Sequence, residues 1–295
     1  MQHVVVGIGE ALWDILPEGK KIGGAPANFA YHISQFGLSS CVVSAVGNDA
    51  LGKELVGELR NKQLNMLIPT VNYPTGTVMV QLDSNGIPSY DITEDVAWDN
   101  IPFTPELETL AKSTCAMTFG SLAQRNEISR RTIHRFIDSM PEGDNVLKVF
   151  DINMRQNYCT TEIAAESLQK CNILKINDEE LIVLSRMFAI PGINMDDMCM
   201  QILNEYQLKM VVLTCGVNGS YVFTDSGTSF MPTPVVDVAD TVGAGDSFSA
   251  SFIAAILKGK SVSEAHRLAA DVSAFVCTNH GAMPTLSEEL LSRLR

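Results

Sequence analysis

Hydrophobic and polar positions along this chain follow two periods that alternate through most of its length. Short runs of apolar and β-branched residues are typical of buried strands, and longer stretches with an apolar residue every three or four positions are typical of amphipathic helices. The predicted strands include residues 4–8, 41–46, 115–119, 147–151, 173–176 and 211–214. The predicted helices include residues 27–35, 51–61, 130–138, 177–188 and 195–206. This alternation predicts an α/β fold, with a parallel sheet covered by helices on both faces.

One region departs from the alternation. Residues 77–83 and 87–92 form two strand patterns around the turn Ser84-Asn85-Gly86, and no helix pattern follows directly. Together with residues around 12–21, they predict a small sheet set apart from the main one. A simple edge hairpin is the alternative.

Composition and charge narrow the class of protein. The 295 residues are 46% hydrophobic and 19% charged, which is an ordinary globular composition with enough length for a sizeable core. A net charge of −13 disfavours a nucleic-acid groove or an anionic membrane surface as partner. The first residues lack a basic signal-peptide region, and no apolar run approaches the length of a membrane span. The seven cysteines form no Cys-x-x-Cys pair, so we expect free thiols and a cytoplasmic protein.

The segment Asp240-Thr241-Val242-Gly243-Ala244-Gly245-Asp246-Ser247-Phe248 combines a glycine-rich turn with an acidic residue. It follows the β-branched run 235–238 and precedes an apolar-periodic stretch, a pattern that predicts a strand, a turn and a helix N-terminus. Unpaired N–H groups at the start of a helix attract anions, and a carboxylate beside a bound phosphate is unfavourable unless it accepts a proton. Asp246 is therefore a candidate general base for a hydroxyl that attacks a phosphoryl group. An ordinary helix N-cap is the alternative.

A second glycine-rich segment, Gly23-Gly24-Ala25-Pro26-Ala27-Asn28, has the features of a binding turn. Its glycines permit close approach of the backbone to a ligand, and proline suits the first turn of a helix. Asn28 would then present an amide suited to neighbouring sugar hydroxyls. Asp14 follows the first predicted strand, where open α/β sheets bind ligands, and it is either a hydroxyl acceptor or a turn residue.

These two segments, with Gly37 after the first, resemble the two signatures of the ribokinase-like carbohydrate kinases. The resemblance covers essentially the whole chain in the right order. Residues 150–155, Asn177-Asp178-Glu179-Glu180 and residues 213–219 are similar to further segments of that family. Within the family the chain is most similar to fructokinases, on the basis of Gly9, Glu10, Asp14, Pro17 and residues 98–101.

The resemblance implies a single Rossmann-like domain over residues 1–295, with a small β-sheet lid formed from about 10–22 and 75–98. It implies that Asp246 is the base and that the N–H groups of residues Gly243–Asp246 form an anion hole. It also implies that Arg155 contacts the transferring phosphoryl group or the sugar.

The other site residues follow from the same resemblance. The implied sugar-binding residues are Asp14, Gly23, Gly24, Asn28 and Asn153, and the implied nucleotide-binding residues are Asn177, Thr214, Gly216, Gly219 and Asn279. Glu180 would hold Mg²⁺ through water, and Asp240 with Gly281 would form a monovalent-cation site. Two departures from the family pattern are Val242, where threonine is more usual, and Asn279-His280, where a basic residue is often found. The second departure leaves potassium dependence open.

The function implied is transfer of the γ-phosphoryl group of ATP, with Mg²⁺, to the 6-hydroxyl of D-fructose. The alternative substrates are 2-keto-3-deoxygluconate and other small sugars or polyols. A sugar-sensing or scaffold protein of the same fold, without catalysis, is a second alternative. The partners expected are sugar and ATP, and pairing of two copies through open lid strands is left open.

Overall fold

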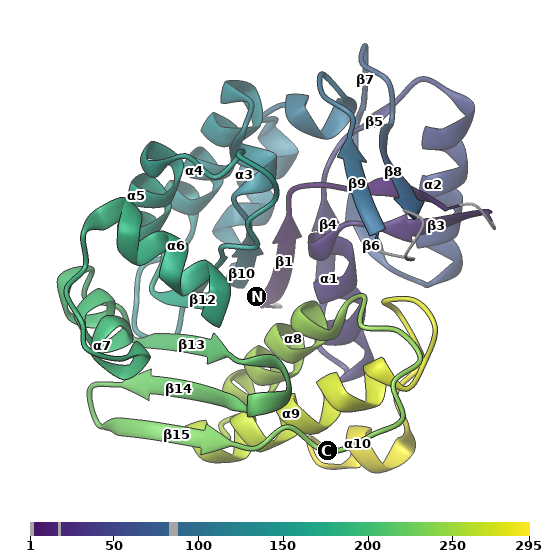
Figure 1. Ribbon diagram of the computed structural model, residues 1–295. Coiled ribbons are helices and arrows are strands. Elements are labelled where there is room, and N and C mark those ends of the chain that lie inside the picture. The colour runs from purple at the N-terminus through teal and green to yellow at the C-terminus, as the bar shows by residue number, and fades with distance from the viewer. Residues whose placement is uncertain (1–2, 17–18, 83–87) are drawn as a thin grey trace.

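The computed structural model describes residues 3–16, 19–82 and 88–295, and Figure 1 shows their arrangement. Within these residues the main sheet has nine strands in the order β15-β14-β13-β12-β11-β10-β1-β4-β6. Neighbouring strands from β6 through β13 are parallel, whereas β14 and β15 pair antiparallel at one edge. The predicted α/β class is confirmed, and the antiparallel edge is an addition to the predicted parallel sheet.

The strands of the main sheet match the predicted apolar runs closely. They are β1 (Val4–Ile8), β4 (Ser40–Val43), β6 (Asn65–Leu67), β10 (Thr114–Phe119), β11 (Leu147–Asp151), β12 (Ile173–Asn177), β13 (Met210–Thr214), β14 (Ser220–Thr224) and β15 (Gly227–Met231). Most positions in the central strands are buried, because helices cover both faces of a parallel sheet.

Helices cover the two faces of the sheet and bury separate cores. One side carries α1 (Ala25–Gln35), α2 (Ala50–Asn61), α8 (Ala244–Leu257), α9 (Val262–Cys277) and α10 (Glu288–Ser292). The other side carries α3 (Pro105–Lys112), α4 (Glu127–Ser139), α5 (Thr161–Lys170), α6 (Asp178–Phe188) and α7 (Met195–Glu205). Successive residues of a strand point to opposite faces of the sheet. In β1, Val5 packs with α1, α8 and α9, and Val6 belongs to the core on the side of α3–α7. Short 3₁₀ turns lie at η1 (Ala97–Asn100), η2 (Leu122–Gln124) and η3 (Gly216–Asn218).

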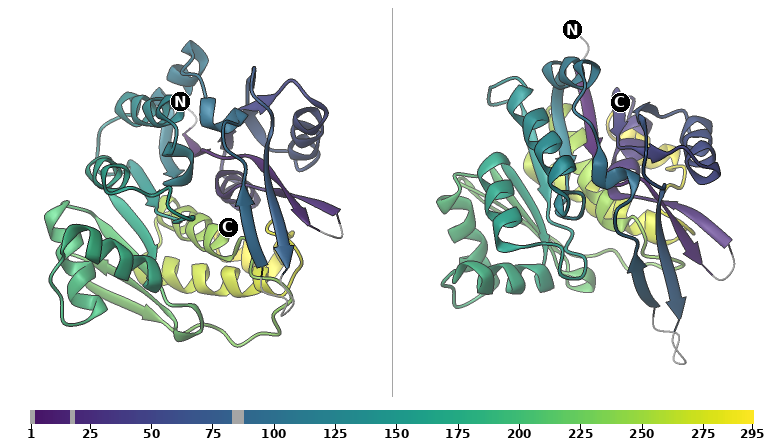
Figure 2. Two further views of the ribbon diagram at one scale, coloured as in Figure 1. Left: turned by 45° about the horizontal axis from the view of Figure 1, so that its top comes forward. Right: turned by 90° about the horizontal axis from the view of Figure 1, so that it is seen from above.

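The predicted small sheet is present. Its order in the described chain is β3 (Gly19–Gly23), β2 (Leu12–Leu16), β8 (Gly76–Leu82) and β9 (Pro88–Ile92). Strand β2 pairs antiparallel with β3 and parallel with β8, and β9 pairs antiparallel with β8. Figure 2 shows this sheet standing apart from the nine-stranded sheet. The predicted turn Ser84-Asn85-Gly86, and Pro17, lie outside the described residues.

Two strand predictions are wrong in part or in whole. The predicted strand 41–46 ends at Val43, and the chain then leaves the main sheet so that β5 (Val46–Gly47) pairs with β7 (Thr70–Val71). The β-branched run 235–238 forms no strand, and Val235 is 100% exposed. High β-propensity alone does not make a strand, because a strand needs a neighbour to pair with and a face to bury. The turn and the helix predicted after that run are present.

Two expectations from composition can be compared with the structure. All seven cysteines are free, as predicted. In the part of the chain that the structure describes, no helix has both the length and the apolar character needed to cross a membrane.

Candidate active site

The carboxyl ends of the parallel strands meet at one edge of the main sheet. Strand β1 ends just before Glu10, β11 ends at Asp151, and β12 ends at Asn177, whose register partner on β13 is Thr214. Open α/β sheets bind ligands at this edge. A pocket lies here, and its lining includes Glu10, Pro26, Asn153, Asp246 and Ser249.

Helix α8 begins with the glycine-rich turn. Gly243 is its N-cap with φ of 78°, and a Cβ at this position would lie 2.5 Å from the Cβ of Ala282, so only glycine fits. The Ala244 N–H donates to the Thr241 carbonyl at 3.3 Å, whereas the N–H groups of Gly245 and Asp246 have no acceptor among the described residues. This helix end therefore has two N–H donors and the positive end of the helix dipole available for an anion.

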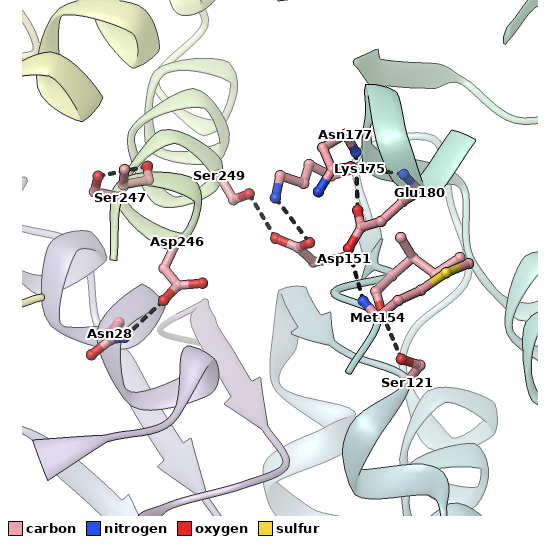
Figure 3. Close-up of polar contacts among 12 residues, drawn as sticks. Asn28, Ser121, Asp151, Met154, Lys175, Asn177, Glu180, Asp246, Ser247 and Ser249 are labelled. Atoms are coloured by element: carbon pink, nitrogen blue, oxygen red, sulfur yellow. Dashed lines mark hydrogen bonds and ion pairs between the residues drawn. The ribbon is translucent and has the colours of Figure 1, made fainter. Parts of the chain in front are cut away.

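Asp246 lies in the first turn of α8 and does not cap it. Gly243 is the N-cap, and Asp246 is the third residue of the helix, so the N-cap alternative for Asp246 is wrong. Asn28 Nδ2 donates to Asp246 Oδ2 at 2.7 Å (Figure 3). Burial and the nearby Asp151 carboxylate raise the pKa of Asp246 to about 6, against the opposing effects of the Asn28 bond, Lys175 and Arg155. A carboxylate with a pKa close to neutral pH is suited to accept a proton.

The predicted sugar-binding segments, around Asp14 and at Gly23-Gly24, lie in close contact. A Cβ on Gly23 would lie 2.4 Å from Asp14 Oδ2, and one on Gly24 would lie 2.4 Å from the Glu10 carbonyl oxygen. The glycines therefore let the turn before α1 approach strand β2 and the segment after β1. Burial raises the pKa of Asp14 to about 6, although the charges of Arg155 and Lys21 act to lower it.

Glu10 belongs to the site, although the sequence marked it only as a family feature. Its side chain is buried, and Oε2 has no hydrogen-bond partner among the described residues. Burial, reinforced by the Asp246 charge, raises the pKa of Glu10 to about 7. The Arg155 charge lowers the pKa of Glu10, Asp14 and Asp246.

Asn177 and Glu180 form a reciprocal cap at the start of α6. Asn177 Oδ1 accepts the Glu180 N–H at 2.8 Å, and Glu180 Oε2 accepts the Asn177 N–H at 3.0 Å. Glu180 Oε1 accepts the Met154 N–H at 2.8 Å, which fixes the loop that carries Asn153 and Arg155. Because both Glu180 oxygens already accept an N–H, contact with Mg²⁺ through water fits this carboxylate better than direct ligation. No group of three or more His, Cys, Asp and Glu side chains among the described residues could hold a metal ion by itself.

The remaining predicted residues lie outside the lining of the pocket, and hydrogen bonds hold two of them, Asp240 and Asn279. Asp240 accepts the N–H groups of Val242 and Gly281, each at 3.0 Å. Burial opposes ionisation of Asp240, but these bonds hold its pKa below the usual value. Asn279 Nδ2 donates to the Phe275 carbonyl at 2.9 Å, at the end of α9. In the described chain, Thr214, Gly216, Gly219 and Asn279 do not line the pocket around Asp246.

Three further residues were missed by the sequence reasoning: Asp151 and Ser249, which line the pocket, and Lys175, which is paired with Asp151. Lys175 Nζ lies 3.1 Å from Asp151 Oδ1, and Ser249 Oγ donates to Asp151 Oδ2 at 3.3 Å. The signal available was a lysine inside an otherwise apolar strand pattern, Ile173-Leu174-Lys175-Ile176. Such a residue is rarely buried unless it is paired.

Comparison with known proteins gives a consistent picture. A family model described as "pfkB family carbohydrate kinase" matches residues 18–289. Fructokinase-2 of Oryza sativa subsp. japonica is 27% identical, with 99% of this chain and 94% of the relative covered. ATP-dependent 6-phosphofructokinase of Thermoanaerobacterium thermosaccharolyticum is 28% identical, with 97% and 92% covered.

Solved structures are similar along the whole chain. An uncharacterized sugar kinase of Pyrococcus horikoshii in complex with ATP has a TM-score of 0.80 and 25% identity, and 99% of this chain and 100% of that chain are covered. Fructokinase of Xylella fastidiosa with bound ATP has a TM-score of 0.86 at 20% identity, with 100% and 98% covered. A fructokinase double mutant of Vibrio cholerae O395 bound to fructose, ADP and potassium has a TM-score of 0.81 at 22% identity, with 100% and 99% covered. The last two show a shared fold.

Replacing Asn28 by alanine should raise the pKa of Asp246 above about 6, because the variant loses a hydrogen bond to the ionised carboxylate. Carboxyl ¹³C NMR titration of both proteins measures this shift. Asp240 is the internal control, since the N–H groups of Val242 and Gly281, and not Asn28, lower its pKa, which should stay low in both proteins. An unchanged Asp246 titration would show that the Asn28 bond does not stabilise the charge.

Proposed function

The chain belongs to the pfkB family of carbohydrate kinases, and we propose that its sugar substrate is D-fructose, phosphorylated by ATP on the 6-hydroxyl. The observation that carries this proposal is the buried Asp246 carboxylate beside two partnerless N–H groups at the start of α8. A base and an anion site side by side are what transfer of a phosphoryl group to a hydroxyl requires. A sugar-sensing protein without catalysis would have no need of the base.

In the proposed reaction, Asp246 takes the proton of the attacking hydroxyl. The N–H groups of Gly245 and Asp246 receive phosphoryl oxygens and stabilise the charge that develops on them, and Ala244 and Gly243 complete the turn. Asn177 contacts the nucleotide, and Glu180 holds Mg²⁺ through water. When bound, Mg²⁺ neutralises phosphate charge. Arg155, whose charge favours the ionised forms of Glu10, Asp14 and Asp246, contacts the phosphoryl group or the sugar.

The charge of the pocket favours a neutral sugar over an acidic or phosphorylated one. Glu10, Asp151 and Asp246 line the pocket, and Asp14 lies against Gly23 in the turn before α1. The cations that act on Glu10, Asp14 and Asp246 are Arg155, Lys21 and Lys175. Lys20 instead forms an ion pair with Glu54 and lies over the Trp13 ring. A substrate with its own carboxylate or phosphate, such as 2-keto-3-deoxygluconate, would add negative charge to this group.

Hydrogen-bonding groups for a polyol are available in the same place. Asn28 Oδ1 and Glu10 Oε2 are buried without a partner among the described residues, so each can accept a hydroxyl proton from a bound sugar. Asp14 and the Gly23-Gly24 backbone complete the proposed sugar site, together with Asn153 from the lining of the pocket.

Purified protein with ATP and Mg²⁺ should give its highest kcat/KM with D-fructose in a panel that also contains D-ribose, D-glucose, 2-keto-3-deoxygluconate and fructose 6-phosphate. The reason is the match between a neutral polyol and an acidic pocket. A higher kcat/KM for an acidic or phosphorylated sugar would overturn the substrate assignment while leaving the enzyme class intact.

Two variants separate catalysis from sugar binding in that assay. Asp246→Asn should lower kcat about 10²–10⁴-fold with ATP affinity little changed, since general-base catalysis contributes about that factor. Asp14→Ala should raise the sugar KM with a small change in the ATP KM. A folded Asp246→Asn protein with normal kcat would rule out Asp246 as the base.

We propose that the four-stranded small sheet is a lid that closes over the sugar, because water must be excluded for transfer to prevail over hydrolysis. Amide hydrogen exchange in β8 and β9 should slow when fructose is added without nucleotide. The antiparallel pair β14–β15, which lies at the other end of the main sheet, is the control and should exchange at the same rate with and without fructose. Unchanged exchange in β8 and β9 at saturating fructose would contradict the lid.

We also propose a monovalent cation beside Asp240 and Gly281, next to the turn that begins α8. Gly243 lies against Ala282, so a cation that orders the loop at Gly281 and Ala282 would also order the start of α8. The rate constant kcat of the wild type should rank potassium above sodium above tetramethylammonium at fixed ionic strength, and Asp240→Asn should reduce the differences. Equal rates in the three salts would leave Asp240 as a residue that only caps two N–H groups.

A further inference from the structure

Lys175 lies directly behind the anion site, and none of the roles above uses it. It is the third residue of β12, and its side chain crosses toward the first turn of α8. A Cβ built on Gly245 would lie 3.0 Å from Lys175 Nζ, so the ammonium sits against the Cα of Gly245. The Gly245 N–H is one of the two donors without a partner among the described residues. A fixed cation therefore lies behind this donor.

The Lys175 side chain is held in place and kept charged by carboxylates. Asp151 is the register partner of Lys175 on β11, and its Oδ1 accepts a hydrogen bond from the Lys175 ammonium at 3.1 Å. In Figure 3, Ser249 of α8 reaches the other Asp151 oxygen, so this carboxylate links β12 to α8. Burial alone would lower the pKa of Lys175, but the charges of Asp151, Glu180 and Asp246 raise it above its ordinary value. Lys175 thus carries a permanent positive charge at neutral pH.

A purely structural ion pair is the alternative. Buried ion pairs contribute little net stability compared with a well-packed apolar pair, so stability alone is a weak reason for a lysine in this strand. The Lys175 charge also acts on a specific target, because it lowers the pKa of Asp246 while the Asp151 charge raises it. Two other charged groups interact with Asp246. Arg155 lowers the pKa of Asp246, and the Asp246 charge raises the pKa of Glu10.

We propose that Lys175, held by Asp151, is a positioning residue of the phosphoryl-transfer site: its ammonium keeps Asp246 ionised and adds positive charge behind the Gly245 N–H. This inference rests on the proposed role of Asp246 as the base. In the reaction, the sugar hydroxyl oxygen forms a bond to the γ-phosphorus while the bond from that phosphorus to the leaving ADP oxygen breaks. The hydroxyl proton goes to Asp246, and Lys175 keeps its own proton throughout.

The sign of two pH shifts tests the proposal. Lys175→Met should move the acid limb of the kcat/KM profile to higher pH, because Asp246 loses a stabilising cation. Asp151→Asn should move it to lower pH, because Asp246 loses a neighbouring negative charge. At pH 6, Lys175→Met should lose roughly 10-fold or more in kcat, with a smaller loss at pH 8, while the sugar and ATP KM values change less. Lys175→Arg should restore part of the rate.

Lys148 provides a matched control on the neighbouring strand. It is partly buried on β11, and the charges that act on it come from Asp138, Glu142 and Lys170, away from the pocket. Lys148→Met should leave the pH profile in place. Thermal unfolding of each variant shows whether it is folded. If Lys175→Met is not folded, Lys175→Gln, which also removes the charge, replaces it, and the opposite shifts are measured with Lys175→Gln and Asp151→Asn.

Folded Lys175 and Asp151 variants with an unmoved acid limb would overturn the proposal and leave a structural ion pair. Shifts of both variants in the same direction would also overturn it. Failure of the proposed function gives a different result. A fully active Asp246→Asn protein would show that Asp246 is not the base, and the acid limb could then not be assigned to it.

Discussion

The burial of several carboxyl groups around one pocket is the constraint on which this site depends. Glu10, Asp14 and Asp246 each have a pKa raised toward neutral pH, and burial is the largest cause in all three. A phosphate bound at the start of α8 would bring further negative charge to the same place. The site can work only if fixed dipoles and a few cations offset this charge, and the N–H groups of α8, Lys175 and Arg155 are the groups that do so.

Close backbone contacts bring those groups together from distant parts of the chain. A Cβ on Gly7 would lie 2.2 Å from the Pro26 carbonyl oxygen, so glycine in β1 lets α1 lie directly on the strand. Gly24 permits the equivalent approach to Glu10, and Gly243 the approach to Ala282. With these three contacts, the start of α1 lies against β1 and the segment after it, and the start of α8 lies against the loop around residue 282. The hydrogen bond between Asn28 and Asp246, which are 218 positions apart, is the result.

Local patterns in the sequence predicted most of the fold, because buried parallel strands and amphipathic helices each have a clear period. The β-branched run 235–238 was wrongly predicted to be a strand, because β-propensity is only a local preference. Val235 is fully exposed and pairs with no strand of the described chain. Family motifs located Asp246 and Asn28, whose contact the structure supplies. Glu10, Asp151 and Lys175 could not be assigned, since their importance comes from charges across space. Only a folded chain shows that Lys175 lies against Gly245.

The capping pair at α6 connects the two sides of the site in physical terms. Glu180 accepts one N–H from Asn177, at the end of β12, and another from Met154, in the loop after β11. The first belongs to the proposed nucleotide side, and the second positions Asn153 and Arg155 on the proposed sugar side. Removing the Glu180 carboxylate would leave two N–H donors without acceptors and release both segments together. In the proposed mechanism, this one side chain would set the spacing between nucleotide and sugar, on which the reach of the hydroxyl to the phosphoryl group depends.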